Sequence, residues 1–266
     1  MAWQRAWPLL LTLGLVALGV GVYFGLASAG FPGTPSACLT RFVCYCEVPR
    51  AGLARQPANT WSNAAFFAAA LWIAFDCARF ASASERDLRW LGVWFALGTA
   101  AQGVASMLFH GTLTQWGAIT DAVSIFFVPG LVIGISLVRL GWVAPRFVAL
   151  PAFAALVLAL GYRLFVLPVA APLVLLVALG IVWSERRAHQ SDRNSAARRQ
   201  FLRAMAWLGL GALTWGLSLK PGFPLCSREM PWGHAAWHVV AAGLMASLWR
   251  YATLALTPRL DSARAA

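Results

Sequence analysis

Long runs of hydrophobic residues dominate the chain, and polar or charged residues gather between them. Apolar runs of about 17–25 residues are long enough to cross the hydrocarbon core of a bilayer as helices. A transmembrane barrel strand would instead alternate apolar and polar positions, and these runs do not alternate. The pattern predicts eight membrane-spanning helices, at residues 7–29, 60–75, 88–109, 116–137, 147–162, 164–183, 202–219 and 234–249.

The composition supports a membrane location. Hydrophobic residues make up 60% of the chain and charged residues 11%, whereas soluble domains have about 45–50% apolar residues. We therefore predict an all-α, polytopic transmembrane bundle with a seven-helix core and one extra N-terminal helix. Its expected parts are an N-terminal transmembrane helix or signal anchor (1–30), an outer loop (31–58), the seven-helix core (59–256) and a cytoplasmic tail (257–266).

The first apolar run allows two interpretations. Arg5, the apolar run and the small residues Ala27-Ser28-Ala29 together could form a cleavable signal peptide. The run is long for the apolar region of a signal, which favours a retained helix. Cleavage would leave seven helices, and the loop that follows lies outside in either case.

The basic residues predict the orientation. With the N-terminus inside, most of the 21 lysines and arginines fall in segments on the cytoplasmic side, where basic residues accumulate. Both termini are then cytoplasmic, and the net charge of +12 reflects topology rather than a nucleic-acid partner. The alanine- and arginine-rich sequence, with Lys220 as its single lysine, is typical of a bacterial protein, so we expect the inner (plasma) membrane.

Cysteine positions are consistent with this orientation. Cys38, Cys44, Cys46 and Cys226 fall in predicted outer loops, and Cys77 falls at the inner end of a helix. Thiols on an oxidising face favour one or two disulfides, although they could also remain unpaired. Cys46–Cys226 is the favoured pair, and it would connect the loop before the second helix to the loop before the last.

Several polar residues stand out against the apolar background. Asp121 lies about five residues inside a predicted span, where a carboxylate is costly and usually functional, although it could form a structural hydrogen bond to another helix. His110, His234 and His238 lie at the outer edges of their spans. His189 falls in the arginine-rich inner loop, where we expect it to be solvated.

The spacing of these residues predicts a shared pocket. His234 and His238 are four residues apart and lie on one helix face, as do Ser106 and His110, while Asp121 descends on the next helix. Three neutral imidazoles with an open fourth position are typical of catalytic zinc, which activates water and polarises a carbonyl group. Asp121 could orient or deprotonate that water. Ser106 could bind the metal through water or donate to an oxyanion.

At these residues the chain resembles the alkaline ceramidases and, more loosely, the membrane-hydrolase superfamily that includes the adiponectin-type receptors. The resembling segments are Cys46-Glu47, NTWSN at 59–63, SMLFHGTL at 106–113 and HAAWH at 234–238. The resemblance implies a seven-helix hydrolase that holds Zn²⁺ through His110, His234 and His238, with Asp121 acting on the metal-activated water and Ser106 assisting. It also implies that a ceramide-like N-acyl lipid enters from the bilayer and is cleaved to a fatty acid and an amine. A Cys46–Cys226 disulfide would resemble the lumenal disulfide of that family.

The chain departs from the family pattern in two respects. The acidic calcium site of animal alkaline ceramidases has a clear counterpart only at Glu47, and Cys44, Pro49 and Gln56 stand where other ligands would be expected. Calcium prefers several hard, charged oxygen ligands, so we expect no calcium. The extra N-terminal helix is the second departure.

Two other classes of function remain as alternatives. One is a zinc-binding seven-helix receptor or regulator without hydrolytic turnover. The other is a transporter or a haem protein, but the chain shows no inverted repeat, and His234 and His238 on one helix cannot supply opposite axial ligands. Among partners, we expect a membrane lipid as substrate and no nucleic acid, and the sequence indicates no protein partner.

Overall fold

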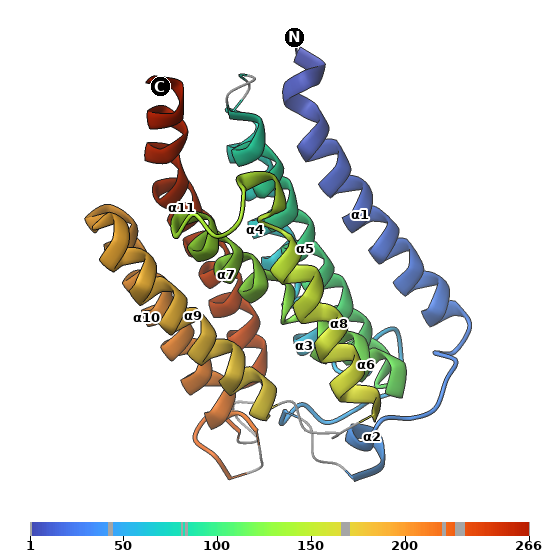
Figure 1. The fold of residues 1–266 in the computed structure, drawn as a ribbon. Helices are drawn as coiled ribbons and strands as arrows, with labels where there is room; N and C mark the ends of the chain where they lie inside the picture. Colours follow the sequence, from blue (N-terminus) through green and yellow to red (C-terminus); the bar gives the residue numbers. More distant parts are fainter. Residues whose placement is uncertain are drawn as a thin grey trace.

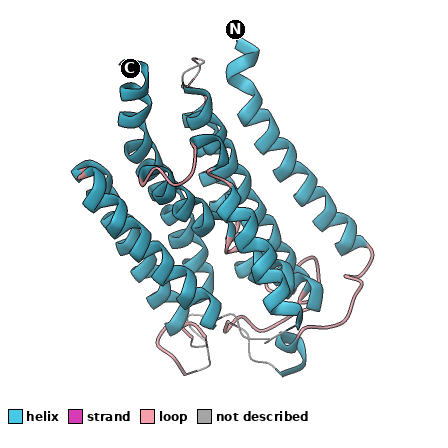
Figure 2. Cartoon of the chain, viewed as in Figure 1, coloured by secondary structure: helices cyan, strands magenta, loops and turns pink. Residues whose placement is uncertain are grey.

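A computed structural model gives the fold, and it describes residues 2–41, 45–80, 82, 85–165, 171–219, 222–226 and 232–265. In these residues helices dominate, and the only strand-like feature is an isolated bridge between Pro35 and Thr114 (Figure 2). The helices are α1 (Ala2–Ser28), α2 (Ala37–Arg41), α3 (Pro57–Trp61), α4 (Ala64–Cys77), α5 (Arg86–Thr112), α6 (Gln115–Ser124), α7 (Phe127–Arg139), the 3-10 helix η2 (Pro145–Phe147), α8 (Leu150–Phe165), α9 (Ala171–Asp192), α10 (Ser195–Leu217) and α11 (Gly233–Ala265). The predicted all-α class is confirmed for the described part of the chain.

The long helices run side by side along a common direction and form a bundle (Figure 1). The N- and C-termini lie at one end of the bundle. The loops that contain α2 and α3 lie at the other end, together with the last turns of α5 and the first turns of α11. The second end is therefore the place where residues from α3, α5 and α11 can meet.

Five stretches in the described residues are long and apolar enough to cross a membrane. They are Ala6–Ser28, Arg86–Thr112, Gln115–Arg139, Pro145–Phe165 and Gly233–Thr257. Large apolar side chains point outward from several helices: Leu18 is 65% exposed, Val157 71% and Leu176 65%. Only a hydrocarbon environment makes such surfaces favourable, so the chain is an integral membrane protein.

Five of the eight predicted spans coincide with these stretches, and the exact seven-plus-one arrangement stays a prediction. α4 contains 14 residues and is shorter than a full crossing. α9 and α10 do not combine sufficient length with sufficient hydropathy, because their ends at the α9–α10 turn are rich in charged residues. The single span predicted at 116–137 is two helices, α6 and α7, separated by Ile125 and Phe126.

The turn between α5 and α6 is short and tightly specified. Leu113 adopts a left-handed conformation with φ 50° and ends α5. The Thr114 hydroxyl then accepts a hydrogen bond from the backbone N–H of Gly117 and caps α6. A Cβ at Gly117 would lie 3.0 Å from Phe109 Cα, so the close approach of the two helices favours glycine there. This turn directs α6 back alongside α5.

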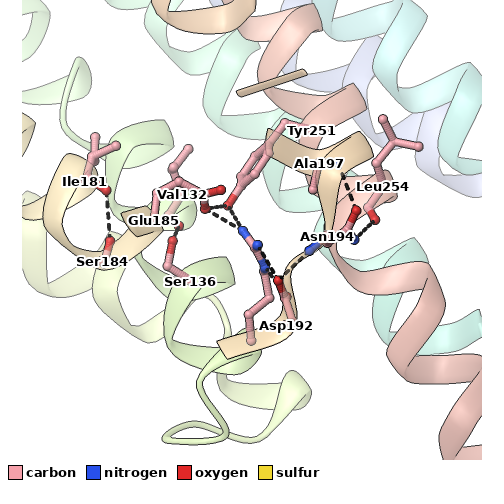
Figure 3. A network of polar contacts seen from close by, with 11 residues as sticks. Val132, Ser136, Ile181, Ser184, Glu185, Asp192, Asn194, Ala197, Tyr251 and Leu254 are labelled. Carbon is pink, nitrogen blue, oxygen red and sulfur yellow. Dashed lines mark hydrogen bonds and ion pairs between the residues drawn. The ribbon is translucent and has the colours of Figure 1, made fainter. Parts of the chain in front are cut away.

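A buried ionic network connects helices near the turn between α9 and α10 (Figure 3). The guanidinium of Arg139, at the end of α7, donates to Asp192 at 2.8 and 3.0 Å and also to Glu185, both on α9. The Tyr251 hydroxyl of α11 bonds to Glu185 and to Arg139. Asn194 caps α10 and donates to the carbonyl oxygen of Leu254 at 2.9 Å. The network therefore joins α7, α9, α10 and α11.

The same region corrects one expectation from the sequence. The arginine-rich segment expected to be a solvated loop is almost entirely helical, because α9 continues to Asp192 and α10 begins at Ser195. His189 lies within α9, where its Nε2 is 3.4 Å from Arg198. The guanidinium of Arg139 and the backbone N–H of Asn194 both donate to the carboxylate of Asp192. These hydrogen bonds stabilise the turn between α9 and α10.

Candidate metal centre

Four of the five side chains expected to share a pocket come from two helices that are far apart in the sequence. α5 carries Ser106 and His110 one turn apart near its C-terminal end, and α11 carries His234 and His238 one turn apart at its start. All four are buried. Because the two helix ends lie at the same end of the bundle, the structure brings these residues together (Figure 1).

The three imidazoles form one compact cluster. One ring nitrogen from each of His110, His234 and His238 lies within 4.8 Å of the other two. The His110 ring centroid is 4.9 Å from that of His234 and 5.2 Å from that of His238. Metal–imidazole bonds are about 2.0–2.1 Å long, so small rotations of the rings would bring all three nitrogens to one ion.

Hydrogen bonds from outside the cluster orient two of the rings. Gln56 donates from Nε2 to the carbonyl oxygen of Glu47 at 2.8 Å, which leaves its Oε1 to accept a bond from His110 Nδ1, also at 2.8 Å. His238 Nδ1 lies 2.7 Å from the Ser62 hydroxyl. Each ring is held through Nδ1, so its Nε2 is left to face the cluster, an arrangement common to metal-binding histidines.

Two buried nitrogens in the cluster lack a hydrogen-bond partner among the described residues. They are His110 Nε2 and His234 Nδ1. A buried polar atom without a partner costs about 1–3 kcal/mol, and a cation between the rings would remove that penalty. The donor set of the cluster also suits a metal ion, because it consists of three imidazoles without a thiolate or an acid.

Asp121 lies on α6, beside the cluster rather than within it. Its Oδ1 accepts a hydrogen bond from Gln102 Nε2 at 3.3 Å, and the Ser106 hydroxyl bonds to the same carboxylate. Ser106 Oγ is also 3.4 Å from His238 Nε2, so the serine links the acid to the imidazoles. Ser124 donates to Gln102 Oε1 at 2.9 Å, which directs the amide nitrogen of Gln102 toward Asp121.

Tyr45 covers the cluster from the loop before α3. Its ring stacks on His234 with a centroid separation of 3.8 Å and meets His110 edge-on at 5.4 Å. Burial, and to a smaller extent the charge of Asp121, raises the pKa of Tyr45 to about 12. The phenol therefore remains protonated near neutral pH and can donate a hydrogen bond.

A disulfide holds this loop beside the start of α11. Cys46 and Cys226 are bonded, with their Cα atoms 5.2 Å apart, and this is the pair that the cysteine positions favour. Because Tyr45 is the neighbour of Cys46, the bond also keeps the tyrosine ring near His234. Cys77 is a free, buried thiol, and Cys44 lies outside the described residues.

Glu47 has a structural partner at each of its carboxylate oxygens. Oε1 accepts a hydrogen bond from the backbone N–H of Ala58 and Oε2 from that of Asn59, both at 2.8 Å. These are otherwise unsatisfied donors in the first turn of α3, so Glu47 caps this helix from outside. The capped helix carries Gln56 at its start and Ser62 at its end, the two residues that orient His110 and His238.

The sequence pointed directly to five of these residues and missed others. Tyr45, Gln56, Ser62 and Gln102 touch the cluster or Asp121, although the sequence analysis did not assign them to the site. Their position beside resembling segments was the available signal: Tyr45 precedes Cys46-Glu47, and Ser62 belongs to NTWSN. Together the residues provide a potential cation site, a carboxylate and two hydroxyl donors, which are the groups needed for hydrolysis of an acyl bond.

Comparison with known proteins agrees with this chemistry. The model of the Ceramidase family matches residues 55–260, most of the chain, and this segment includes Ser106, Asp121 and the three clustered histidines. No curated protein and no solved structure shows a significant match. A family match of this extent establishes the relationship, and with it a hydrolase class that acts on amides. The chain belongs to the ceramidase family.

Proposed function

We propose that the protein is a zinc-dependent intramembrane hydrolase that cleaves the amide bond of a ceramide-like N-acyl lipid to a fatty acid and an amine. The observation that carries the proposal is the cluster of His110, His234 and His238, in which two buried nitrogens have no partner within the described part of the chain, with Asp121 alongside. The family match supports amide hydrolysis. Three imidazole ligands favour zinc over the hard cations, which prefer oxygen ligands.

When bound, zinc would supply Lewis acidity, lowering the pKa of a nearby water and polarising the amide carbonyl. Asp121 accepts a proton from the attacking water at a carboxylate oxygen. The Ser106 hydroxyl, between Asp121 and His238, donates to the carbonyl oxygen as negative charge develops there. The C–N bond then breaks, and Asp121 returns the proton to the departing amine nitrogen.

Gln56 and Ser62 assist without touching the substrate. Gln56 accepts a hydrogen bond from His110 Nδ1, and the Ser62 hydroxyl bonds to His238 Nδ1. These two hydrogen bonds fix the tautomers of the rings. Tyr45, held by the neighbouring disulfide, limits the access of water over His234. These groups keep the site dry and preorganised, which strengthens every electrostatic interaction within it.

We also propose that the histidine cluster faces the outer side of a bacterial inner membrane. The distribution of basic residues favours a cytoplasmic location for both termini, and the termini lie together at the end of the bundle away from the cluster (Figure 1). A seven-helix core over residues 59–256, preceded by the additional helix α1, fits this arrangement. The lipid substrate would enter sideways from the bilayer.

Metal analysis of the purified protein, combined with hydrolysis of a fluorescent short-chain ceramide, tests the proposal. Asp121→Asn should retain the metal and lose about 10²–10⁴-fold in turnover. Asp87→Asn, at the other end of α5, is the matched control and should retain both. Metal without turnover on any N-acyl or ester lipid would favour a receptor or regulator, and absence of metal in the purified protein would contradict both functions.

A further inference from the structure

A groove of about 670 Å³ lies on the outside of the bundle, between α10 and α11. It is lined by residues of α10 and α11 and by Trp72 of α4. A Cβ at Gly243 would lie 3.2 Å from the ring of Trp207, so glycine lets the two helices approach closely there. None of its lining residues belongs to the candidate metal centre.

The groove is polar at one end and apolar at the other. Gln200 on α10 donates to the Ser247 hydroxyl on α11 at 2.9 Å, and this pair marks the polar end together with Arg203 and Arg250. Farther along the two antiparallel helices, Trp207 lies against Gly243, and the lining becomes apolar through to Leu210. A ligand that fills the groove must therefore have a polar head and an apolar body.

The two arginines have no acidic partner among the described residues, and no acidic residue lines the groove. The Arg250 guanidinium lies over the Trp72 ring, 5.6 Å from its centroid, and so is kept beside the groove. Arg250 also lies within a candidate membrane span, seven residues before its end at Thr257, or about 10 Å along the helix. A cation at this depth is costly and normally pairs with an anion.

We propose that this groove binds one anionic phospholipid of the surrounding bilayer. The phosphate lies between Arg203 and Arg250, and an acyl chain follows the apolar part of the groove past Trp207 and Leu210. Basic pockets between transmembrane helices bind anionic headgroups through the same chemistry. Charge complementarity selects an anionic lipid over a neutral one, and the apolar continuation of the groove selects a lipid over free phosphate.

Native mass spectrometry of the full chain in detergent tests this site directly. Phosphatidylglycerol and phosphatidylcholine, matched in acyl chains, are titrated against the wild type. The variant Arg203→Gln/Arg250→Gln should bind phosphatidylglycerol about 30-fold more weakly, since each basic residue near the headgroup contributes about fivefold. The control Arg187→Gln/Arg199→Gln removes two exposed arginines outside the groove and should bind as the wild type does.

A second variant tests the apolar part independently of charge. Ala206→Trp places a large ring into the groove from an exposed position of α10, so the fold should tolerate it, and it should lower phosphatidylglycerol binding. Inorganic phosphate at millimolar concentration should not displace the lipid. The proposal is overturned if phosphatidylcholine binds equally well, if phosphate competes effectively, or if the control pair reduces binding as much as the groove pair. Because the readout is lipid retention, it is independent of hydrolysis.

Discussion

Two buried polar clusters contact α11 at different positions along its length, and their chemistry differs. At one end His234 and His238 meet His110, and two ring nitrogens have no partner among the described residues. In the second half of the helix, Tyr251 joins Arg139 and the two acids of α9 (Figure 3). His238 and Tyr251 are 13 residues apart, or about 20 Å along the helix.

The difference shows how to distinguish a structural cluster from a binding site. In the Arg139 network, positive and negative groups satisfy one another, so the protein itself supplies the partners. In the histidine cluster, Gln56 and Ser62 engage the Nδ1 atoms of His110 and His238, so the Nε2 atoms that face the cluster are acceptors and suit a cation. A convergent set of groups of one kind therefore indicates a ligand, whereas a complementary set indicates a connection between helices.

Removal of the positive charge of Arg139 from its ionic network should give the largest loss of stability. Arg139→Met leaves Glu185 and Asp192 facing each other without a counter-charge, so we expect a loss of about 3–5 kcal/mol in the free energy of unfolding. Denaturant unfolding in detergent micelles measures it. Arg187→Met, on the exposed side of α9, should change stability by less than about 0.5 kcal/mol. Equal effects of the two variants would show that the network is not a specific connection.

A change within the convergent cluster should affect metal binding. His110→Ala removes one of three ligands, so metal affinity should fall by more than the roughly 100-fold that loss of an outer hydrogen-bond partner can cause. Competition with a chelator, followed by metal analysis, measures the affinity. His189→Ala is the matched control, because His189 lies in α9 and outside the cluster. Retention of the metal by His110→Ala would remove the basis for a metal centre.

A smaller loss of metal affinity is expected when a metal-binding histidine is retained but loses the hydrogen bond that orients its ring. Gln56→Leu removes the acceptor of His110 Nδ1, and metal affinity should fall by about 10–100-fold. Gln115→Leu, an exposed glutamine at the start of α6, serves as the control in the same chelator competition. An unchanged affinity in Gln56→Leu would mean that the hydrogen bond does not orient the ring.

The smallest effect is expected at the edge of the Arg139 network. Asn194→Ala removes the cap of α10 and should cost about 1 kcal/mol of stability, with metal affinity unchanged. Asn194→Asp keeps the cap but loses the donor to Leu254, so the two variants separate capping from the connection to α11. A fall in metal affinity in either variant would show that the two clusters are coupled.

The sequence allowed the main features of the site to be predicted. The i, i+4 spacing of His234 and His238 fixed their common helix face, and the short turn after His110 placed Asp121 on a neighbouring antiparallel helix. Hydrophobic runs identified the helical class. They do not by themselves establish the number of spans, since α4 is short and the charged ends of α9 and α10 are helical rather than looped.

The supporting residues could not have been predicted, because their roles depend on contacts between segments distant in the sequence. Gln56 reaches His110 over 54 positions, and Ser62 reaches His238 over 176. Tyr45 lies in a loop without periodicity, and only the disulfide and the packing of α3 determine where its ring lies.

The sequence by itself therefore determined the helices, the membrane environment and the type of chemistry, since these follow from local periodicity, hydrophobicity and the side chains available. The tertiary structure decided which ring nitrogen of His110 and of His238 faces the cluster. It likewise decided which polar groups have a partner within the protein and which remain for a ligand. It also decided that Arg139 has acidic partners, whereas Arg203 and Arg250 face an open groove without any among the described residues. Such pairing depends on the packing of remote helices, and the local pattern of residues does not encode it.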